Sequence, residues 1–453
     1  MTTVHVIGAG LAGCEAAYRL ACEGVSVTLY EMKPVAHSPA HKLDTFAELV
    51  CSNSLKAERL NSAAGLLKHE MRLLFSLTMQ AADANRVEAG GALAVDREGF
   101  SRFVTEKIKN HPNIQIEYGE VCRLPEEGIV IVATGPLTQG ALAEDIRRRC
   151  GREYLSFHDA AAPIVSFDSI DLERVFFAAR YGRGEDAYIN CPFDKEGYER
   201  FWQELVGAES VPLKEFEQEH FRVYEGCMPV EVMAKRGADT IRFGPLKPVG
   251  LRDPKTGHRP WAVVQLRREN AGGTLYNLVG FQTNLKFGEQ KRVFSMIPGL
   301  ENAEFVRYGV MHRNTFLDSP RLLDRYCRLK SDSRIFFAGQ ITGVEGYIES
   351  AASGILAGYN AARAIGRREL LTLPADTMLG ALTSYISDEN VKDFQPMGSN
   401  MGILPPLDTP IRGKEERYRL LAQRAVESLT AYLHANGVET ADIAQIAAKE
   451  SEP

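Results

Sequence analysis

Three glycines between a predicted strand and a predicted helix constrain the fold of this chain more than any other feature. The β-branched residues of Thr3–Ile7 predict a short strand, and the sequence GAGLAG (Gly8–Gly13) follows at once. Apolar periodicity then predicts a helix over residues 11–22, and Val25–Tyr30 predicts a second strand. Strand, helix and strand in this order form a parallel βαβ unit, so the chain is expected to begin with a Rossmann-like α/β fold.

The glycine turn has the chemistry of a dinucleotide site. Its first glycine permits the tight turn, its second lets a pyrophosphate approach the backbone, and its third lets the helix pack closely on the sheet. The helix N-terminus offers unpaired N–H groups to the phosphates, and an acid ends the second strand, where it can accept from ribose hydroxyls. The predicted contacts are therefore Gly8, Ala9, Gly10, Leu11, Ala12, Gly13 and Glu31.

Two later segments favour FAD over NAD(P) or S-adenosylmethionine, whose sites share similar glycine turns. An apolar strand over Gly128–Ala133 ends in Thr134 and Gly135, a second glycine turn that is typical of two-dinucleotide flavoproteins. The segment Ile335–Ala338, followed by Gly339, resembles the late flavin-side strand of the same proteins. We therefore predict FAD as the bound dinucleotide.

The residues after this late strand complete the predicted site. Gln340 stands where those flavoproteins usually have an acid. Tyr347 is expected to lie against the flavin ring and shield it from water. A helix predicted over residues 350–362 would point the positive end of its dipole at the cofactor.

Short strands, aromatic residues and turns dominate the middle of the chain, whereas its last seventy or so residues have mostly helical patterns. We predict a discontinuous Rossmann-like FAD-binding domain over 1–160 and 310–453, an inserted mixed α+β domain over 161–309, and a helical C-terminal part over 375–453. We also expect one helix over about 62–82 and a polar loop over 36–60. The chain has no apolar run long enough to span a bilayer and no signal peptide, so we expect a cytoplasmic protein without membrane contact.

The charge of the chain is distributed unevenly. Its formal net charge is −6, yet residues 242–268 carry seven basic residues against the single acid Asp253. Prolines and glycines within this basic run predict a rigid, irregular loop surface. Such a surface is suited to holding a phosphate backbone.

Eight cysteines are present, and none lies in a CxxC pair or at zinc-ligand spacing. We expect reduced thiols, no metal site, and one or two nucleophiles among them. Composition alone does not identify which cysteines these are.

Several motifs together resemble the folate- and FAD-dependent tRNA (uracil-5-)-methyltransferase family (TrmFO, also called Gid). The resemblance covers nearly the whole chain, to about Pro406. The first and fifth motifs are shared with a larger relative, GidA or MnmG, whose long helical C-terminal domain is absent here. The motifs are GAGLAGCEAA (Gly8–Ala17), CSNSLK (Cys51–Lys56), EGCMPVE (Glu225–Glu231), RFGPLKPVGL (Arg242–Leu251), GQITGVEGY (Gly339–Tyr347) and FQPMGSNMG (Phe394–Gly402).

The resemblance implies methylation of the T-loop uridine (U54) of tRNA at C5. The carbon would come from 5,10-methylenetetrahydrofolate and the electrons from NAD(P)H through FAD. This chemistry needs a thiolate that adds to C6 of uracil and a base that removes the C5 proton. The resemblance implies Cys227 as the nucleophile and Cys51 as the base or flavin-side partner, and the division of roles stays open.

Three other functions fit parts of the pattern. The same chemistry on a uridine of 23S ribosomal RNA would use the same motifs. An NAD(P)H-dependent flavin oxidoreductase would need neither Cys227 nor the basic run. A flavin-stabilised RNA-binding protein would bind RNA without either cysteine. The oligomeric state and the choice between NADH and NADPH are not predicted.

Overall fold

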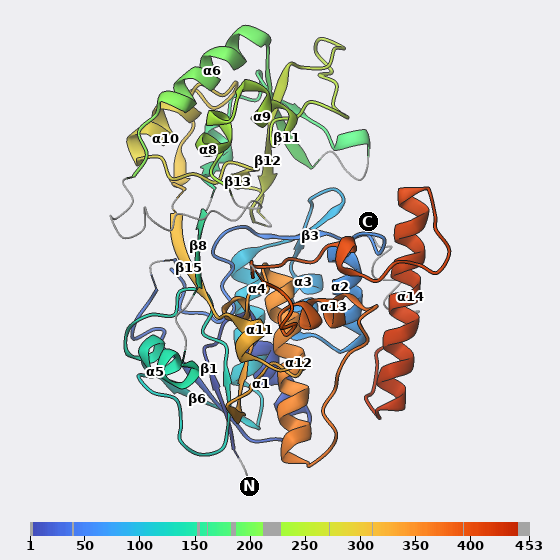
Figure 1. Cartoon of the computed structure of the whole chain (residues 1–453). Helices are drawn as coiled ribbons and strands as arrows, with labels where there is room; N and C mark the ends of the chain where they lie inside the picture. Colours follow the sequence, from blue (N-terminus) through green and yellow to red (C-terminus); the bar gives the residue numbers. More distant parts are fainter. Residues whose placement is uncertain are drawn as a thin grey trace.

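The computed structural model describes residues 3–38, 40–151, 155–160, 162–182, 187–211, 228–270, 272–309, 311–392 and 394–442. Figure 1 shows two bodies joined by a narrow ribbon of two strands. We call them the Rossmann body, which contains the first and last described residues, and the inserted body, which is formed by the described residues between 162 and 309.

A six-stranded sheet forms the centre of the Rossmann body, in the order β16-β17-β7-β1-β2-β6. All neighbours pair in parallel except the antiparallel edge strand β16. The carboxyl ends of β17, β7, β1 and β2 therefore meet at one edge, where such sheets bind ligands. The strands are β1 (Val4–Ile7), β2 (Val27–Glu31), β6 (Ile114–Tyr118), β7 (Ile129–Val132), β16 (Arg328–Leu329) and β17 (Asp332–Phe337).

Two helices pack side by side on one face of this sheet, α1 (Leu11–Cys22) and α12 (Tyr347–Ile365) (Figure 1). A Cβ atom at Gly354 of α12 would lie 2.2 Å from the carbonyl oxygen of Ala12, so a glycine is needed for this close approach. Helix α4 (Arg97–Lys109) joins the same core, and α5 (Gly140–Cys150) covers the opposite face. The two faces of the sheet are thus covered by helices, as parallel sheets require.

The inserted body is built on an antiparallel sheet with the strand order β10-β11-β12-β13-β9-β14. Its core contains the buried rings of Phe201, Phe281 and Phe294. The elements are β9 (Ile164–Ser166), β10 (Phe176–Phe177), β11 (Tyr188–Phe193), α6 (Lys195–Gly207), α8 (Val230–Lys235), α9 (Ala238–Phe243), β12 (Ala262–Arg268), β13 (Leu275–Leu278), α10 (Phe287–Phe294) and β14 (Phe305–Arg307).

A two-stranded antiparallel ribbon connects the bodies (Figure 1). Strand β8 (Leu155–Ala160) enters the inserted body, and β15 (Met311–Phe316) returns from it. Domain boundaries at 160 and 310 stay a prediction, and this ribbon is the segment at which they fall.

The C-terminal part of the chain packs back on the Rossmann body. Helix α14 (Lys414–Ala435), which lies in the part of the chain predicted to be helical, buries Leu421, Ala425 and Leu429 in the core shared with α2 (Ala63–Leu73). Helix α13 (Met378–Tyr385) lies between α12 and α2. Within the described ranges, none of the helices combines the length and the apolar character needed to cross a bilayer.

The single helix expected over 62–82 is wrong, because the chain breaks between α2 and α3 (Leu77–Ala84). Phe75 adopts a left-handed φ of 54°, and the Ser76 hydroxyl caps α3 by accepting from Met79 N at 3.2 Å. The buried carboxylate of Glu15 also accepts from Thr78 N at 2.7 Å. Glu15 is far away in sequence, so local periodicity did not reveal this break.

The polar loop expected over 36–60 is also only partly correct. Ser54–Ala57 forms strand β3, which pairs with β5 (Ala92–Val95), and β5 in turn pairs with β4 (Arg86–Val87). Phe46 and Leu49 are buried in the main core. The polar composition of this segment did not reveal that it folds onto the Rossmann body.

Lys68 of α2 predicts a specific pH dependence of stability. Its ammonium group is buried, donates to the carbonyl oxygens of Leu55 at 2.8 Å and Ala57 at 2.6 Å, and lies 3.7 Å from Glu58. Burial lowers the pKa of Lys68 from 10.5 to about 8. Between these two values the unfolded chain binds the extra proton, so stability rises with pH, by at most about 1.4 kcal/mol per unit.

We therefore expect the unfolding free energies of the native protein and of Lys68→Met to diverge between pH 8 and 10.5. Denaturant titrations at several pH values measure this difference. The variant also loses two hydrogen bonds, which adds an offset that does not depend on pH. A difference that stays constant across the window would contradict the prediction.

Candidate functional site

A cavity of about 310 Å³ lies at the carboxyl edge of the parallel sheet. This volume is within the range of small-molecule sites in proteins. Of the predicted cofactor contacts, only Gly13 does not line it. The predicted residues that do line it are Gly8, Ala9, Gly10, Leu11, Ala12, Glu31, Thr134, Gly135, Gly339, Gln340 and Tyr347.

The three glycines of the first turn differ in what surrounds them. Gly8 has a φ of 98°, and a Cβ there would lie 2.7 Å from the carbonyl oxygen of Ala133. A Cβ at Gly13 would lie 1.8 Å from the Gly8 carbonyl oxygen, so only a glycine here lets the helix pack against the turn. A Cβ at Gly10 or Gly135 would meet no atom within 4 Å. The open space at these two glycines leaves the backbone accessible to a pyrophosphate, as FAD requires.

Glu31 is fixed by the turn it faces. One of its carboxylate oxygens accepts from Ala9 N at 2.9 Å, and the other accepts from Lys33 N at 2.9 Å. These bonds tie the end of β2 to the glycine turn and hold the carboxylate at the cavity wall. Each oxygen keeps one lone pair, with which it can accept from a ribose hydroxyl.

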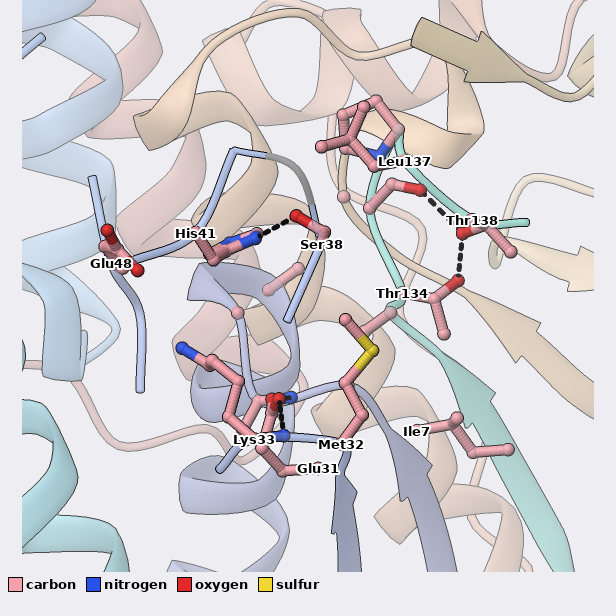
Figure 2. Close-up of a pocket in the computed structure, with 18 of the residues that line it drawn as sticks. Ile7, Glu31, Met32, Lys33, Ser38, His41, Glu48, Thr134, Leu137 and Thr138 are labelled. Carbon is pink, nitrogen blue, oxygen red and sulfur yellow. Dashed lines mark hydrogen bonds between the residues drawn. The ribbon is translucent and has the colours of Figure 1, made fainter. Parts of the chain in front are cut away.

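Figure 2 shows a part of the cavity wall that the sequence analysis missed. Ser38 and His41, in the segment expected to be loop, hydrogen-bond through Oγ and Nδ1 at 2.6 Å. Burial lowers the pKa of His41, which favours the neutral ring. Across the cavity, Thr138 Oγ1 lies 2.6 Å from Thr134 Oγ1 (Figure 2). The segment was predicted only as a polar loop, and its histidines are the one feature of the sequence that could have indicated a role.

The N-terminus of α12 brings the late glycine motif to the cavity. Gln340 donates to the buried Glu345 at 2.9 Å, so the residue that replaces the usual acid is held by an acid nearby. Tyr347 lines the cavity, and its hydroxyl accepts from Cys51 N at 2.6 Å and Ser52 N at 3.2 Å. Burial raises the pKa of Tyr347, so the phenol stays protonated. The predicted flavin-side tyrosine therefore also anchors the loop of a predicted catalytic cysteine.

Three arginines hold this cysteine loop, and we call them the arginine clasp: Arg97, Arg267 and Arg307. Arg97 donates to the carbonyl oxygens of Leu49 at 2.6 Å and Cys51 at 3.3 Å. Arg307 donates to the carbonyl oxygen of Val50. Arg267 donates to Ser52 Oγ at 2.6 Å. Since Arg267 and Arg307 belong to β12 and β14, the inserted body contributes directly to the loop.

The clasp brings more positive than negative charge to the loop. Its described acidic partner is the buried Glu269, which pairs with Arg97. Burial lowers the pKa of Arg267 and of Arg307 and raises the pKa of Glu269. Cations beside a thiol favour its ionised form. The geometry therefore suits a reactive Cys51, whose neighbour Val50 lines the cavity.

Cys227 lies outside the described residues, so its role as the nucleophile stays a prediction. The chain resumes at Met228, and Val230 N donates to the Gln282 carbonyl oxygen at 2.7 Å. None of the seven described cysteines is in a disulfide. Cys14 is buried on α1, where burial raises its pKa, in agreement with a packing role.

The basic run 242–268 is only partly the exposed loop that its composition predicts. Arg267 is buried in the clasp, Arg242 stacks on Trp261 with 3.7 Å to the ring centroid, and Arg268 pairs with Glu88 at 3.2 Å. The run ends in strand β12, which pairs with β11 within the antiparallel sheet. Its remaining four cations are exposed: Lys247, Arg252, Lys255 and Arg259.

Tyr347→Phe tests the link between the cavity and the cysteine loop. The change removes the acceptor of two backbone N–H groups, so we expect a loss of about 1–3 kcal/mol in the free energy of unfolding. We also expect faster alkylation of Cys51 because its loop is less restrained. Denaturation and site-resolved mass spectrometry measure these effects, with Tyr326→Phe, at a half-buried tyrosine, as the matched control. Unchanged stability and labelling would contradict this role.

The parallel sheet, the glycine turn with Glu31 and the cavity define a Rossmann-like FAD-binding protein of the two-dinucleotide flavoprotein type. A family model described as "Glucose inhibited division protein A" matches residues 3–369. The chain belongs to this family, and within it to the TrmFO group.

Relatives from several bacteria carry one shared description, methylenetetrahydrofolate--tRNA-(uracil-5-)-methyltransferase TrmFO. The protein from Desulforamulus reducens is 59% identical over 431 residues, which cover 95% of this chain and 97% of the relative. The protein from Acetivibrio thermocellus is 60% identical over 430 residues, which cover 95% and 98%. The crystal structure of GidA from Aquifex aeolicus matches with a TM-score of 0.68 at 17% identity, over 99% of this chain and 75% of that chain. The structural match supports the fold.

Proposed function

We propose that this protein methylates C5 of the T-loop uridine (U54) in tRNA, with 5,10-methylenetetrahydrofolate as carbon donor and NAD(P)H as reductant through FAD. The observation that carries the proposal is the position of Cys51 beside a cavity with the features of an FAD site, held by three arginines and Tyr347. The shared description of relatives at 59% and 60% identity supports the reaction and its substrates.

Different residues of the cavity would hold different parts of the cofactor. The amides of the first glycine turn would hold the pyrophosphate, and Glu31 would accept from the ribose. Tyr347 and the start of α12 would face the flavin ring. Bound FAD, once reduced, supplies the hydride that turns the transferred methylene into a methyl group.

The two cysteines would act on the uracil. The thiolate of Cys227 adds to C6 and makes C5 nucleophilic, so that C5 attacks the methylene carbon of the donor. Cys51, in the alternative to its flavin-side role, takes the proton that leaves C5. Tetrahydrofolate leaves as the C5 proton is removed, which gives an exocyclic methylene. Hydride addition to this methylene then expels the Cys227 thiolate, restores the C5–C6 double bond and frees the enzyme. The clasp keeps the Cys51 loop at the cavity wall throughout.

The test uses purified protein, NADPH, tRNA that lacks the T-loop modification, and donor labelled in its methylene carbon. We expect label in 5-methyluridine that depends on the folate and is indifferent to S-adenosylmethionine. Cys227→Ala and Cys51→Ala should each lower this activity by a factor of at least about 1,000, since each deletes a reacting group. Cys122→Ala, at an exposed cysteine of the Rossmann body, is the matched control.

Other outcomes separate the alternatives. Label in 23S ribosomal RNA but not in tRNA would move the same chemistry to another substrate. NADPH oxidation without label in either RNA would leave a flavin oxidoreductase. RNA binding without either activity would leave a binding protein. Label that persists in Cys227→Ala would overturn the assignment of the nucleophile and keep the reaction.

A further inference from the structure

An exposed tyrosine of the inserted body takes no part in the site described above. Tyr181 follows strand β10 and is 62% exposed. It faces Gly250 in the RFGPLKPVGL segment, whose glycine and exposed cations the cavity does not use. We call Tyr181, Gly250, Lys247 and Arg252 the Tyr181 platform.

The backbone conformation that exposes the Tyr181 ring is strained. Tyr181 has φ 61° and ψ 20°, in the left-handed region that a bulky residue rarely adopts. Its N–H donates to the Gly250 carbonyl oxygen at 2.9 Å. A Cβ at Gly250 would lie 2.9 Å from Cε1 of the ring, so the ring rests directly on this glycine. Strain of this kind persists only where surrounding structure enforces it, and it gathers at functional sites.

The neighbouring arginine supplies this enforcement. Arg180 donates to the Val249 carbonyl oxygen at 2.8 Å and to Gln265 Oε1 at 2.8 Å. Gln265 in turn donates to the buried Asn190 at 2.9 Å. The turn that carries the ring is therefore fixed to the loop at Val249 and Gly250 and to the centre of the antiparallel sheet.

The segment that carries Gly250 also carries exposed cations, which favour an anionic partner. Lys247, Arg252 and Arg259 are exposed, and none of them has an ion pair among the residues that the structure describes. They stand out in a chain whose formal net charge is −6. An exposed aromatic ring that contacts a segment with exposed cations is a combination suited to single-stranded nucleic acid, in which the ring stacks a base and the cations hold phosphates.

Strand β12 links the platform to the cysteine loop. Gln265 contacts Arg180, and Arg267, two residues further along the same face, contacts Ser52. Residues two apart in a strand are about 7 Å apart. We propose that the Tyr181 platform stacks an unpaired base of the RNA substrate, close to the RNA loop from which the target base is extruded. This inference rests on the proposed function and names a contact surface for its RNA.

The test compares variants that separate the ring from the fold. Tyr181→Asn removes the ring and tolerates the left-handed backbone, whereas Tyr181→Phe keeps the ring. We expect Tyr181→Asn to raise the Kd for an unmodified tRNA transcript by roughly tenfold or more and Tyr181→Phe to leave it nearly unchanged. FAD content and RNA-independent NADPH oxidation should stay at native levels in both. The matched control is Phe177→Ala, at a residue of the same segment that is 45% exposed on β10.

Salt dependence separates stacking from charge. The double variant Lys247→Ala and Arg252→Ala should flatten the dependence of log Kd on log salt, because each lost phosphate contact removes roughly 0.7–0.9 from the slope. Tyr181→Asn should weaken binding without changing this slope. Both results together support the proposal.

Three outcomes would overturn it. An unchanged Kd of Tyr181→Asn for tRNA would show that the ring does not stack a base of the RNA. A raised KM for methylenetetrahydrofolate at an unchanged tRNA Kd assigns the ring to the folate. Equal weakening by Phe177→Ala makes the effect non-specific. If the native protein binds tRNA in a Tyr181-dependent way but transfers no methyl group, the proposed function fails and the platform stands.

Discussion

Gly13→Ala is expected to give a protein that retains less than a tenth of its FAD. The added Cβ would lie 1.8 Å from the Gly8 carbonyl oxygen, a separation that real atoms do not adopt, so the glycine turn must move away from α1. The amides of that turn are the predicted pyrophosphate ligands, and a helix N-terminus loses its anion affinity when its N–H groups are misdirected. Absorbance of the flavin relative to protein at 280 nm measures the retained FAD.

Two further glycines make this result interpretable. Gly91→Ala adds a Cβ with no atom within 4 Å, in another turn of the Rossmann body, and should retain FAD fully. Gly10→Ala also meets no protein atom, but its methyl group points to the proposed pyrophosphate position. It should fold normally and bind FAD more weakly. Full FAD retention in Gly13→Ala would show that the turn tolerates displacement and would remove the basis of the predicted site.

The local parts of this fold were predictable because each depends on a few neighbouring residues. Apolar periodicity predicted α1 with the bounds that the structure shows, and the spacing of the glycine turn and Glu31 correctly placed Gly8–Ala12 and Glu31 at one cavity. In contrast, the break before α3 depends on Glu15, which reaches it from α1. Interactions between residues far apart in sequence leave no periodic signal.

The candidate site shows the same division. The motif around Cys51 identified the residue, but nothing local indicated that Tyr347 and two arginines of the inserted body would fix its loop. Arg267 in particular belonged to a run interpreted as an exposed basic surface, although it is buried. Charge composition does not distinguish a guanidinium that faces solvent from one that satisfies a buried loop, because both occur in the same sequence context.

Arg267→Met is the second change with a large expected effect. The guanidinium donates to Ser52 Oγ at 2.6 Å and to Asn53 Oδ1 at 3.2 Å, so its loss weakens the attachment of the Cys51 loop to the inserted body and removes a cation from the site. Hydrogen bonds from a charged donor contribute about 1.5–3 kcal/mol, so we expect methyl transfer to fall roughly 10- to 100-fold. FAD content should not change, because Arg267 does not line the cavity.

The readout that a general loss of stability would not reproduce is the reactivity of Cys51 itself. Mass spectrometry can follow alkylation of Cys51 by iodoacetamide, with the exposed Cys22 as an internal reference. If the clasp favours the ionised thiol, Arg267→Met slows alkylation of Cys51 at pH 7, and higher pH restores its rate. Arg259→Met, at an exposed arginine of the same basic run, should leave the alkylation of Cys51 unchanged. Faster alkylation in Arg267→Met would mean that the arginine shields the loop rather than activating its thiol, and the role assigned to the clasp would then be wrong.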